Sequence, residues 1–230
     1  MATFTSRDHS AYRRLVALLL SFVLALVPLA SASAQSVGET LRDFEARWAH
    51  AVFESKGREQ ARALSKLLKD TREFARSHDD SPDAAAWHGI VAHECLRAGC
   101  KSAQGSLRKE ARDALQKADS LDPYVLDGRA AAHLGALYAR TSSSFGGFGS
   151  SVKGIGYLWR ALVIDPDCLD SNYLYAEFLV EEKNLAEARD ILRKAMATPA
   201  RQEHYVADRG LHRQIRDLLA AVESRLLKSG

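Results

Sequence analysis

The chain has 230 residues, of which 32 are Lys or Arg and 29 are Asp or Glu, so its formal net charge is +3. A charge this close to neutral excludes the strongly basic surface that nucleic-acid binding needs, and no nucleic-acid partner is expected. Ala, Leu, Arg, Glu and Asp dominate and β-branched runs are few, which predicts an almost entirely helical fold.

The N-terminal 34 residues have the pattern of a secretory signal peptide. Three arginines precede an uncharged run over 15–29, and Ala32-Ser33-Ala34 supplies the small residues of a cleavage site. The run is shorter than the roughly 20 apolar residues that a membrane span requires, and Pro28 interrupts it. We therefore expect residues 1–34 to be removed and 35–230 to be one periplasmic domain without a stable membrane anchor. An uncleaved anchor is the alternative.

Four prolines mark a repeating turn along the rest of the chain. The stretches SPDA, LDPYVLD, IDPDCLD and ATPA place Pro82, Pro123, Pro166 and Pro199 at intervals of 41, 43 and 33 residues. Helical patterns fill the gaps between them. Helix–turn–helix units of about 34 residues that end at a proline resemble the tetratricopeptide repeat (TPR).

The middle unit carries the TPR resemblance most fully. Leu134-Gly135 and Tyr138 fit the L-G-x-x-Y signature of the first helix, and the second helix places a small, a large and a small residue as the family does. Small residues let helix backbones approach, and large ones fill the spaces between turns. The second-helix triads of the three units are Ala111, Leu115 and Ala118; Gly154, Leu158 and Ala161; and Ala188, Leu192 and Ala195.

The resemblance implies an all-α, TPR-like solenoid of helix–turn–helix units with terminal capping helices. Three repeats cover 82–200. An amphipathic helix pair over 37–80 is interpreted as a degenerate N-terminal unit, and a helix over 205–227 as the cap on the last hydrophobic edge.

Two of the three units are longer than the usual TPR. The small residues of the two helices lie twelve positions apart in the last unit, as is usual, but nineteen apart in the first two. We expect seven-residue insertions in the turns at about 98–107 and 141–154, on one edge of the stack, where such insertions often form a binding face. The pairs of small residues are Ala92 and Ala111, Gly135 and Gly154, and Ala176 and Ala188.

The second insertion, TSSSFGGFGSSVKG, is rich in glycine and includes Lys153. It does not fit a phosphate-binding loop, because Gly154 follows the lysine and no strand is evident before it. Phe145 and Phe148 either tuck onto the helices beneath or face solvent as anchors for a partner. Phe145, Phe148 and Lys153 are therefore candidates for partner binding.

In TPR proteins the first helix of each unit lines a concave groove, so the resemblance assigns further candidates for partner binding. The groove-facing positions mix small, aromatic and charged residues, which suits an extended peptide or a helix. These candidates are Arg129, Arg140, Tyr173, Glu177 and Glu181, with Asp170 on the same face.

Cys95 and Cys100 flank the end of a predicted helix in CLRAGC, where Gly99 is well placed to cap it. In an exported protein they can form a disulfide if the helix ends near Ala98; otherwise both remain thiols. Cys168 is left over and expected to be buried.

His88 and His93 lie five residues apart, so on a helix they occupy different faces. No zinc-binding spacing is present, and we interpret both as helix-surface histidines. No metal, cofactor or nucleophile–base pair is predicted, so the sequence does not predict an enzyme.

A narrower resemblance concerns the order of leader, helix pairs, SSSFGGFGSSVKG and GYLWRALVIDPDCLDSNYLYAEFL. This order is similar to the periplasmic T component associated with TRAP-type transporters. The resemblance implies contact with a solute-binding protein, with homo-oligomerisation and a small hydrophobic ligand as further implications. The sequence thus predicts a periplasmic module that binds another protein through its groove or long turns, with an accessory transport component as the alternative.

Overall fold

The computed structural model describes residues 36–143 and 147–229, and within them every regular element is a helix. The signal peptide predicted over 1–34 lies outside the described residues. By its contacts the chain divides into residues 1–43 and 44–230, and the packing described below is that of the second unit. None of the described helices is long and apolar enough to cross a membrane.

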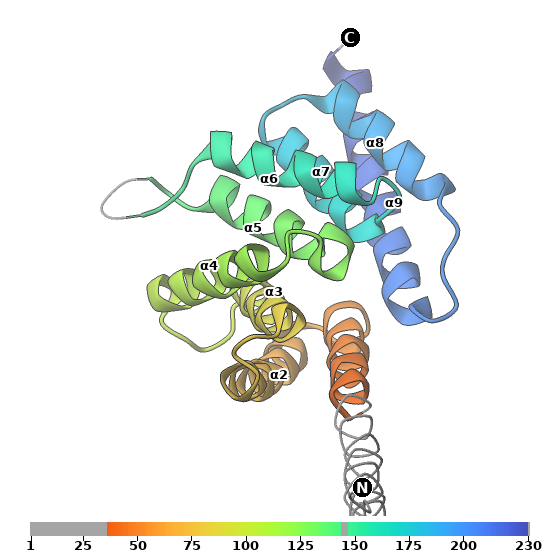
Figure 1. The fold of residues 1–230 in the computed structure, drawn as a ribbon. Helices are drawn as coiled ribbons and strands as arrows, with labels where there is room; N and C mark the ends of the chain where they lie inside the picture. The colour runs from red at the N-terminus through yellow and green to blue at the C-terminus, as the bar shows by residue number, and fades with distance from the viewer. Residues whose placement is uncertain (1–35, 144–146, 230) are drawn as a thin grey trace, which may run out of the picture. The chain divides into compact units, whose positions relative to one another are not determined.

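The helices of the second unit follow one another as packed pairs: α3 (Pro82–Ala98) with α4 (Gln104–Leu121), α5 (Arg129–Arg140) with α6 (Ser151–Ile164), and α7 (Leu169–Glu181) with α8 (Leu185–Ala197) (Figure 1). Successive pairs pack through their first helices, α3 on α5 and α5 on α7, and the second helix of one pair also packs on the first helix of the next, α4 on α5 and α6 on α7. The all-α fold expected from the sequence is confirmed. The remaining elements are a helix over 36–53 and α2 (Gly57–Ser77) before α3, a 3-10 turn (Val125–Gly128) before α5, and α9 (Tyr205–Ser229) after α8.

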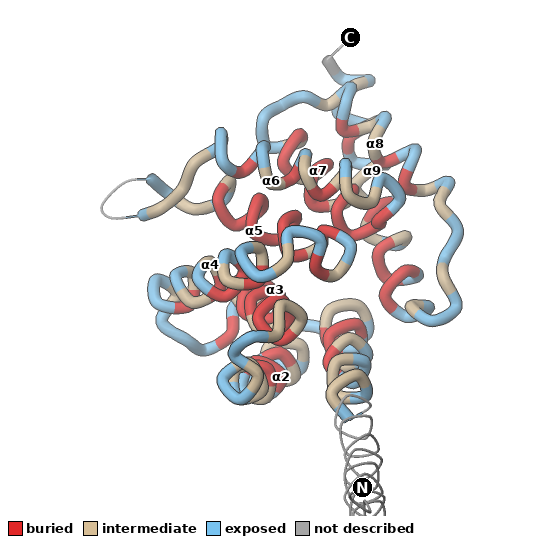
Figure 2. Tube along the Cα trace, viewed as in Figure 1, coloured by how far each residue is buried: buried red, intermediate tan, exposed pale blue. Residues whose placement is uncertain are grey.

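The first helix of each pair is buried along most of its length, whereas the second buries a narrower stripe (Figure 2). Each second helix, α4, α6 or α8, places its small–large–small triad on this stripe. All nine triad residues are buried, and the leucines at their centres are fully enclosed. The positions that the repeat pattern selected in the second helices are therefore core positions.

Local residues fix where these helices begin and end. Ser81 caps α3 by accepting a hydrogen bond from the Ala84 backbone N–H at 3.2 Å, with Pro82 as the first helical residue. Gly99 ends α3 in the left-handed region at φ 67°. Ser150 caps α6 in the same way, accepting from the Lys153 backbone N–H at 3.3 Å.

The two predicted insertions turn out differently. Ten residues, 141–150, connect α5 to α6, against three between α7 and α8, so the seven extra residues are in this turn as expected. The prediction of a long inserted turn at about 98–107 is wrong, because only five residues, 99–103, separate α3 from α4. Most of the extra length is helical there: α3 has 17 residues and α4 has 18, against 13 each in α7 and α8. Leu107, 2% exposed, anchors the added turn of α4 in the core.

The C-terminal helix α9 packs against α7 and α8. Leu211, Ile215 and Val222 lie buried on one stripe of it and join the core of the later helix pairs. This is the packing expected of a helix that covers an otherwise open hydrophobic edge.

A disulfide joins Cys95 to Cys100 across the end of α3, with the two Cα atoms 5.1 Å apart. The bridge is possible because α3 ends at Ala98, which is the condition set by the sequence. Cys168 is a free, buried thiol, and burial raises its pKa. Of the two alternatives for CLRAGC, the structure has the bridged one.

Removing the bridge should lower the free energy of unfolding by about 2 kcal/mol, because even a short cross-link restricts the unfolded chain. We expect this loss for the double variant Cys95→Ala, Cys100→Ala in denaturant titrations. Dithiothreitol should shift the wild-type midpoint toward that of the variant and leave the variant unchanged. Thiol counting on denatured wild-type protein should give one thiol; three thiols before reduction would contradict the bridge.

Candidate functional site

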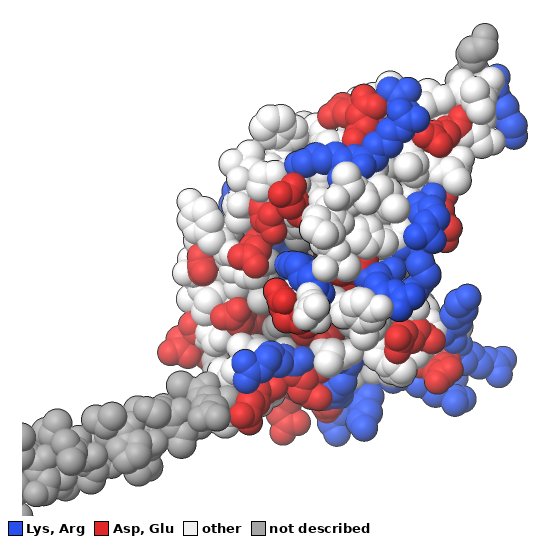
Figure 3. Space-filling model, turned by 90° about the vertical axis from the view of Figure 1, so that its right-hand side faces the viewer, with Lys and Arg blue, Asp and Glu red and all other residues white. Residues whose placement is uncertain are grey.

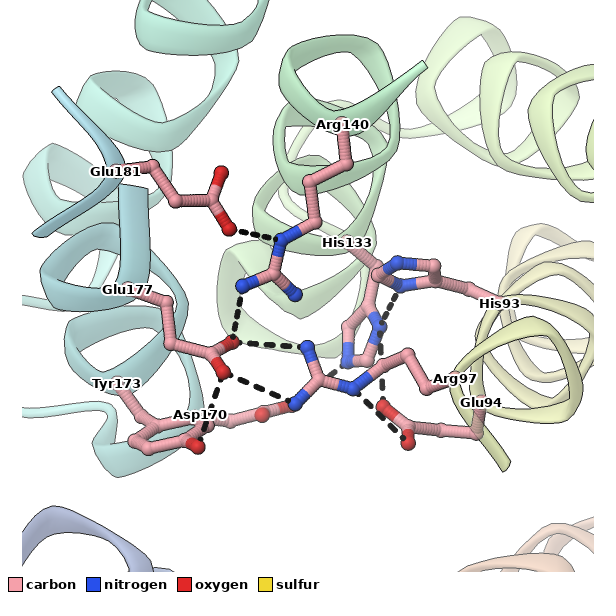
Figure 4. Close-up of polar contacts among 9 residues, drawn as sticks. All are labelled: His93, Glu94, Arg97, His133, Arg140, Asp170, Tyr173, Glu177 and Glu181. Carbon is pink, nitrogen blue, oxygen red and sulfur yellow. Dashed lines mark hydrogen bonds and ion pairs between the residues drawn. The ribbon is translucent and has the colours of Figure 1, made fainter. Parts of the chain in front are cut away.

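The three first helices α3, α5 and α7 carry a connected network of polar side chains where they lie side by side (Figure 4). Each helix contributes at least two members, so the network ties together three successive helix pairs. Its members are His93, Glu94 and Arg97 from α3, His133 and Arg140 from α5, and Asp170, Tyr173, Glu177 and Glu181 from α7.

Glu177 is the centre of the charged part of the network. Arg97 forms a two-pronged ion pair with it, with Nη1–Oε2 and Nη2–Oε1 distances of 2.8 and 3.3 Å. Arg140 reaches Glu177 Oε2 at 3.3 Å and Glu181 Oε1 at 2.7 Å, and the Tyr173 hydroxyl donates to Glu177 Oε1 at 3.1 Å. Such bidentate, charge-assisted contacts hold side chains in one geometry.

These contacts set the protonation states around Glu177. Burial would raise the pKa of Glu177, but Arg97 and Arg140 outweigh it and lower the pKa below its usual range. Burial and the neighbouring Glu177 carboxylate raise the pKa of Tyr173. The carboxylate therefore stays ionised and the phenol stays protonated at neutral pH.

The second part of the network is buried and contains two histidines. His133 Nε2 lies 2.9 Å from Asp170 Oδ2, and its Nδ1 lies 2.9 Å from Nδ1 of His93. Glu94 Oε1 is 3.9 Å from the same His133 Nδ1. All four residues are buried, and His133 is fully enclosed.

Burial and charge act on these groups in opposite directions. Burial, followed by the neighbouring His133, holds the pKa of His93 well below its ordinary value. Burial raises the pKa of Glu94. Burial would also raise the pKa of Asp170, but the neighbouring His133 outweighs burial and lowers the pKa below its ordinary value. The Asp170 carboxylate thus accepts the hydrogen bond from His133 Nε2.

A pocket of about 380 Å³ adjoins the network. His93, Arg97 and Arg140 line it together with Arg108 from α4 and Thr141. The buried histidine pair therefore has one member at a cavity wall, next to three arginines.

The structure brings together five of the residues predicted on the groove face, which are Arg140, Asp170, Tyr173, Glu177 and Glu181. Arg129 is elsewhere: its guanidinium contacts Glu45 at 3.3 Å and lies 5.2 Å from the Trp87 ring centroid. Of the groove candidates, those that meet in the network are bonded to one another rather than left open.

The loop candidates pack near the base of the 141–150 turn. Phe148 lies edge-on to Tyr138, with ring centroids 5.5 Å apart, and the Arg112 guanidinium lies 4.6 Å from its ring. Phe148 is thus half-buried. Of the two predicted alternatives, it packs onto the helices beneath rather than facing solvent. The Lys153 ammonium lies 5.4 Å from the Tyr138 ring. Phe145 lies outside the described residues.

Sequence reasoning missed the histidine pair. His93 was expected on a helix surface, and this is wrong: it is 3% exposed, because its imidazole meets His133 of the next helix pair. His88, by contrast, is half-buried and contacts Glu110 Oε1 at 2.7 Å. No spacing in the chain signals that residues 40 positions apart share a hydrogen bond.

A second candidate surface is the outer face of α6. Four apolar residues at helical spacing point outward from it, with Val152 81%, Trp159 57% and Val163 65% exposed, and Ile155 completing the row. We call these four residues the α6 stripe. Lys153 and Arg160 are the only charged residues of α6, and none is acidic.

Charge elsewhere is mixed. On the face drawn in Figure 3, basic and acidic side chains are interspersed rather than gathered into one large patch of a single sign.

Comparison of the chain with models of known protein families and with curated proteins gives no match in either case.

Proposed function

We propose that this protein is an exported interaction module that binds another protein through the α6 stripe and the adjoining residues 147–150. The observation that carries the proposal is the exposure of Val152, Trp159 and Val163 on one helix face. A surface helix normally turns charged and polar residues outward, and α6 turns apolar ones. Trp is the residue type most enriched among those that dominate binding energy at protein interfaces.

The α6 stripe also indicates the chemistry of its partner. From Val152 to Val163 it extends about 16 Å along the helix axis, at about 1.5 Å per residue. That length fits a partner helix or strand with an apolar row of similar length. Because Lys153 borders the stripe and α6 has no carboxylate, we expect acidic residues beside the partner's apolar row.

The predicted groove is a weaker candidate for the contact. Its charged residues Arg140 and Glu177 already form an ion pair with each other, and Arg97 also pairs with Glu177. A ligand in that position would have to replace these ion pairs with equally good ones to gain affinity.

The alternative, an accessory component of a TRAP-like uptake system, names one specific partner for the same surface. The two stretches that carry that resemblance, 142–154 and 156–179, include Val152, Trp159 and Val163. The leader pattern and the Cys95–Cys100 bridge support export, because stable disulfides form in oxidising compartments. The proposal assigns no catalytic activity.

The test compares two sets of surface variants. The double variant Val152→Ser, Trp159→Ala removes two of the four apolar side chains of the α6 stripe, and Leu227→Ser alters an apolar side chain 85% exposed elsewhere. Wild-type protein and the Leu227→Ser control should retain the same discrete protein from periplasmic extract, and the stripe variant should lose it. Binding of that purified partner should weaken at least about tenfold in the stripe variant.

Two other results would decide against the proposal. If light scattering shows a wild-type oligomer that the stripe variant converts to a monomer, the stripe binds a second copy of this chain. If the partner binds the stripe variant as well as wild type, another surface makes the contact. Identification of the partner as a solute-binding protein would select the transport alternative.

A further inference from the structure

We propose that His93, His133 and Glu94 form a binding site for a divalent metal ion of the zinc class. The three side chains come from two helices, α3 and α5, and all are buried. This site is independent of the α6 stripe, so the two proposals stand or fall separately.

The ligand atoms already converge. The two Nδ1 atoms are 2.9 Å apart, Glu94 Oε1 is 3.9 Å from His133 Nδ1, and all three ligand atoms lie within 4.8 Å of one another. Ligand atoms bound at about 2.0–2.1 Å to a tetrahedral zinc ion are separated by about 3.3 Å. Small side-chain rotations, opening the histidine pair and closing the glutamate, therefore suffice to enclose an ion.

Asp170 supplies the outer-sphere contact that metal-binding histidines usually have. Its Oδ2 lies 2.9 Å from His133 Nε2, so the Nε2–H donates outward and the Nδ1 lone pair points toward His93 and Glu94. Two nitrogens that face each other at this distance need either a shared proton or a cation between them. In the metal-free protein the His93 Nδ1–H supplies that proton, and a bound ion would take its place.

Carboxylates lie beside the converging ligand atoms. The network in Figure 4 contains four carboxylates, on Glu94, Asp170, Glu177 and Glu181, but two guanidinium groups, on Arg97 and Arg140. Of these groups, Glu94 Oε1 and Asp170 Oδ2 lie 3.9 and 2.9 Å from the two ring nitrogens of His133, so two carboxylates border the ligand atoms themselves. Glu94 can serve the ion through Oε1 while Oε2 keeps its 3.6 Å contact with Arg97 Nε.

The site also has an approach and a place for a fourth ligand. His93 lines the pocket of about 380 Å³, which gives an ion a path to the buried nitrogens. Two histidines and one glutamate leave one position of a tetrahedral ion open to water or to a small anion from that pocket. Imidazole and carboxylate ligands together suit zinc, cobalt or nickel better than calcium or magnesium.

The experiment titrates metal-stripped mature protein with ZnCl₂ against a chromophoric chelator and counts the bound metal by atomic absorption. One zinc ion per chain is expected. Co²⁺ should give the intense visible absorption of a four-coordinate site. His93→Gln and His133→Gln should each abolish both signals, and Asp170→Asn should weaken zinc binding by about 10- to 100-fold.

The matched control is His88→Gln, which removes a histidine from the same helix α3 outside the site and should leave stoichiometry and spectrum unchanged. Glu94→Gln keeps the side-chain volume and should weaken binding in a protein with wild-type circular dichroism, which covers the case in which a histidine variant fails to fold. Two results would overturn the proposal. One is wild-type protein that binds no zinc at stoichiometric concentration. The other is binding that survives in folded His93→Gln and Glu94→Gln alike.

Discussion

Replacing Gly135 with Val should lower the free energy of unfolding by about 3 kcal/mol, near the upper end of what overpacking usually costs. A Cβ at position 135 would lie 2.8 Å from the Gly154 carbonyl oxygen, 2.8 Å from Leu158 Cγ and 2.9 Å from the Leu158 backbone nitrogen. Two of these three atoms belong to the backbone of α6, so a rotamer change cannot relieve the contact. The helices α5 and α6 would have to move apart and expose the Leu158 side chain.

The matched control is Gly156→Val on α6, where a Cβ meets nothing within 4 Å and the residue is exposed. Both substitutions replace a helical glycine with the same residue, so they share any change in helix propensity. We expect the control to stay within about 0.5 kcal/mol of wild type, as surface substitutions usually do. Denaturant titration of the two variants measures the difference; equal stabilities would mean that α5 and α6 do not cross as closely as described.

Gly135 also shows what a single sequence can reveal about this fold. The repeat pattern placed it opposite Gly154 and Leu158 because a helix crossing needs small residues at fixed offsets, and such offsets are visible along the chain. The same reasoning located the triads of α4, α6 and α8, while the capping preference of glycine indicated the end of α3 beside Gly99. Each of these features depends on spacing within one helix pair, where neighbours in sequence are neighbours in space.

The histidine pair shows where such reasoning stops. His93 and His133 are 40 residues apart and belong to different helix pairs. Their contact depends on how α3 packs against α5, which includes the rotation of each helix about its axis. A pattern of small and large residues fixes that rotation only roughly. Single-sequence spacing therefore predicted His93 at the surface and did not predict that His93, Glu94 and Asp170 all meet at His133.

The extra length of the first unit could not be assigned to loop or helix for a related reason. The count of nineteen residues between small positions is the same in the first two units. In the first, Leu107 can be buried if α4 begins early, and the chain gains by forming more helix. In the second, the glycines and serines of 142–150 favour an irregular path, so the extra residues stay in the turn.

Replacing Glu110 with Gln should destabilise the protein by between about 2 and 3 kcal/mol at pH 7, with the loss disappearing as the pH falls. Glu110 joins three helices: His88 Nε2 on α3 lies 2.7 Å from its carboxylate, and Arg72 on α2 donates from Nε at 2.6 Å and from Nη2 at 3.0 Å. The His88 hydrogen bond, with the Arg72 contacts and against burial, lowers the Glu110 pKa to about 2.

The sign of the pH effect follows from that shift. Because the folded-state pKa is depressed, the unfolded chain takes up a proton first as the pH falls. The stabilisation is therefore complete above the ordinary value of 4.5 and is lost between 4.5 and about 2. At about 1.36 kcal/mol per pKa unit the full shift corresponds to about 3.4 kcal/mol, which partial exposure of the pair reduces.

Denaturant titrations of wild type, Glu110→Gln and the exposed α2 control Glu73→Gln at several pH values between 7 and 2.5 measure this effect. Below pH 4.5 the free energy of unfolding of wild type should converge on that of Glu110→Gln. The free energy of unfolding of Glu73→Gln should stay within about 0.5 kcal/mol of wild type at every pH. If the difference in the free energy of unfolding between wild type and Glu110→Gln stays constant down to pH 2.5, the variant has lost packing rather than a charge interaction. Convergence would show that one carboxylate holds α2, α3 and α4 together through its ionised form.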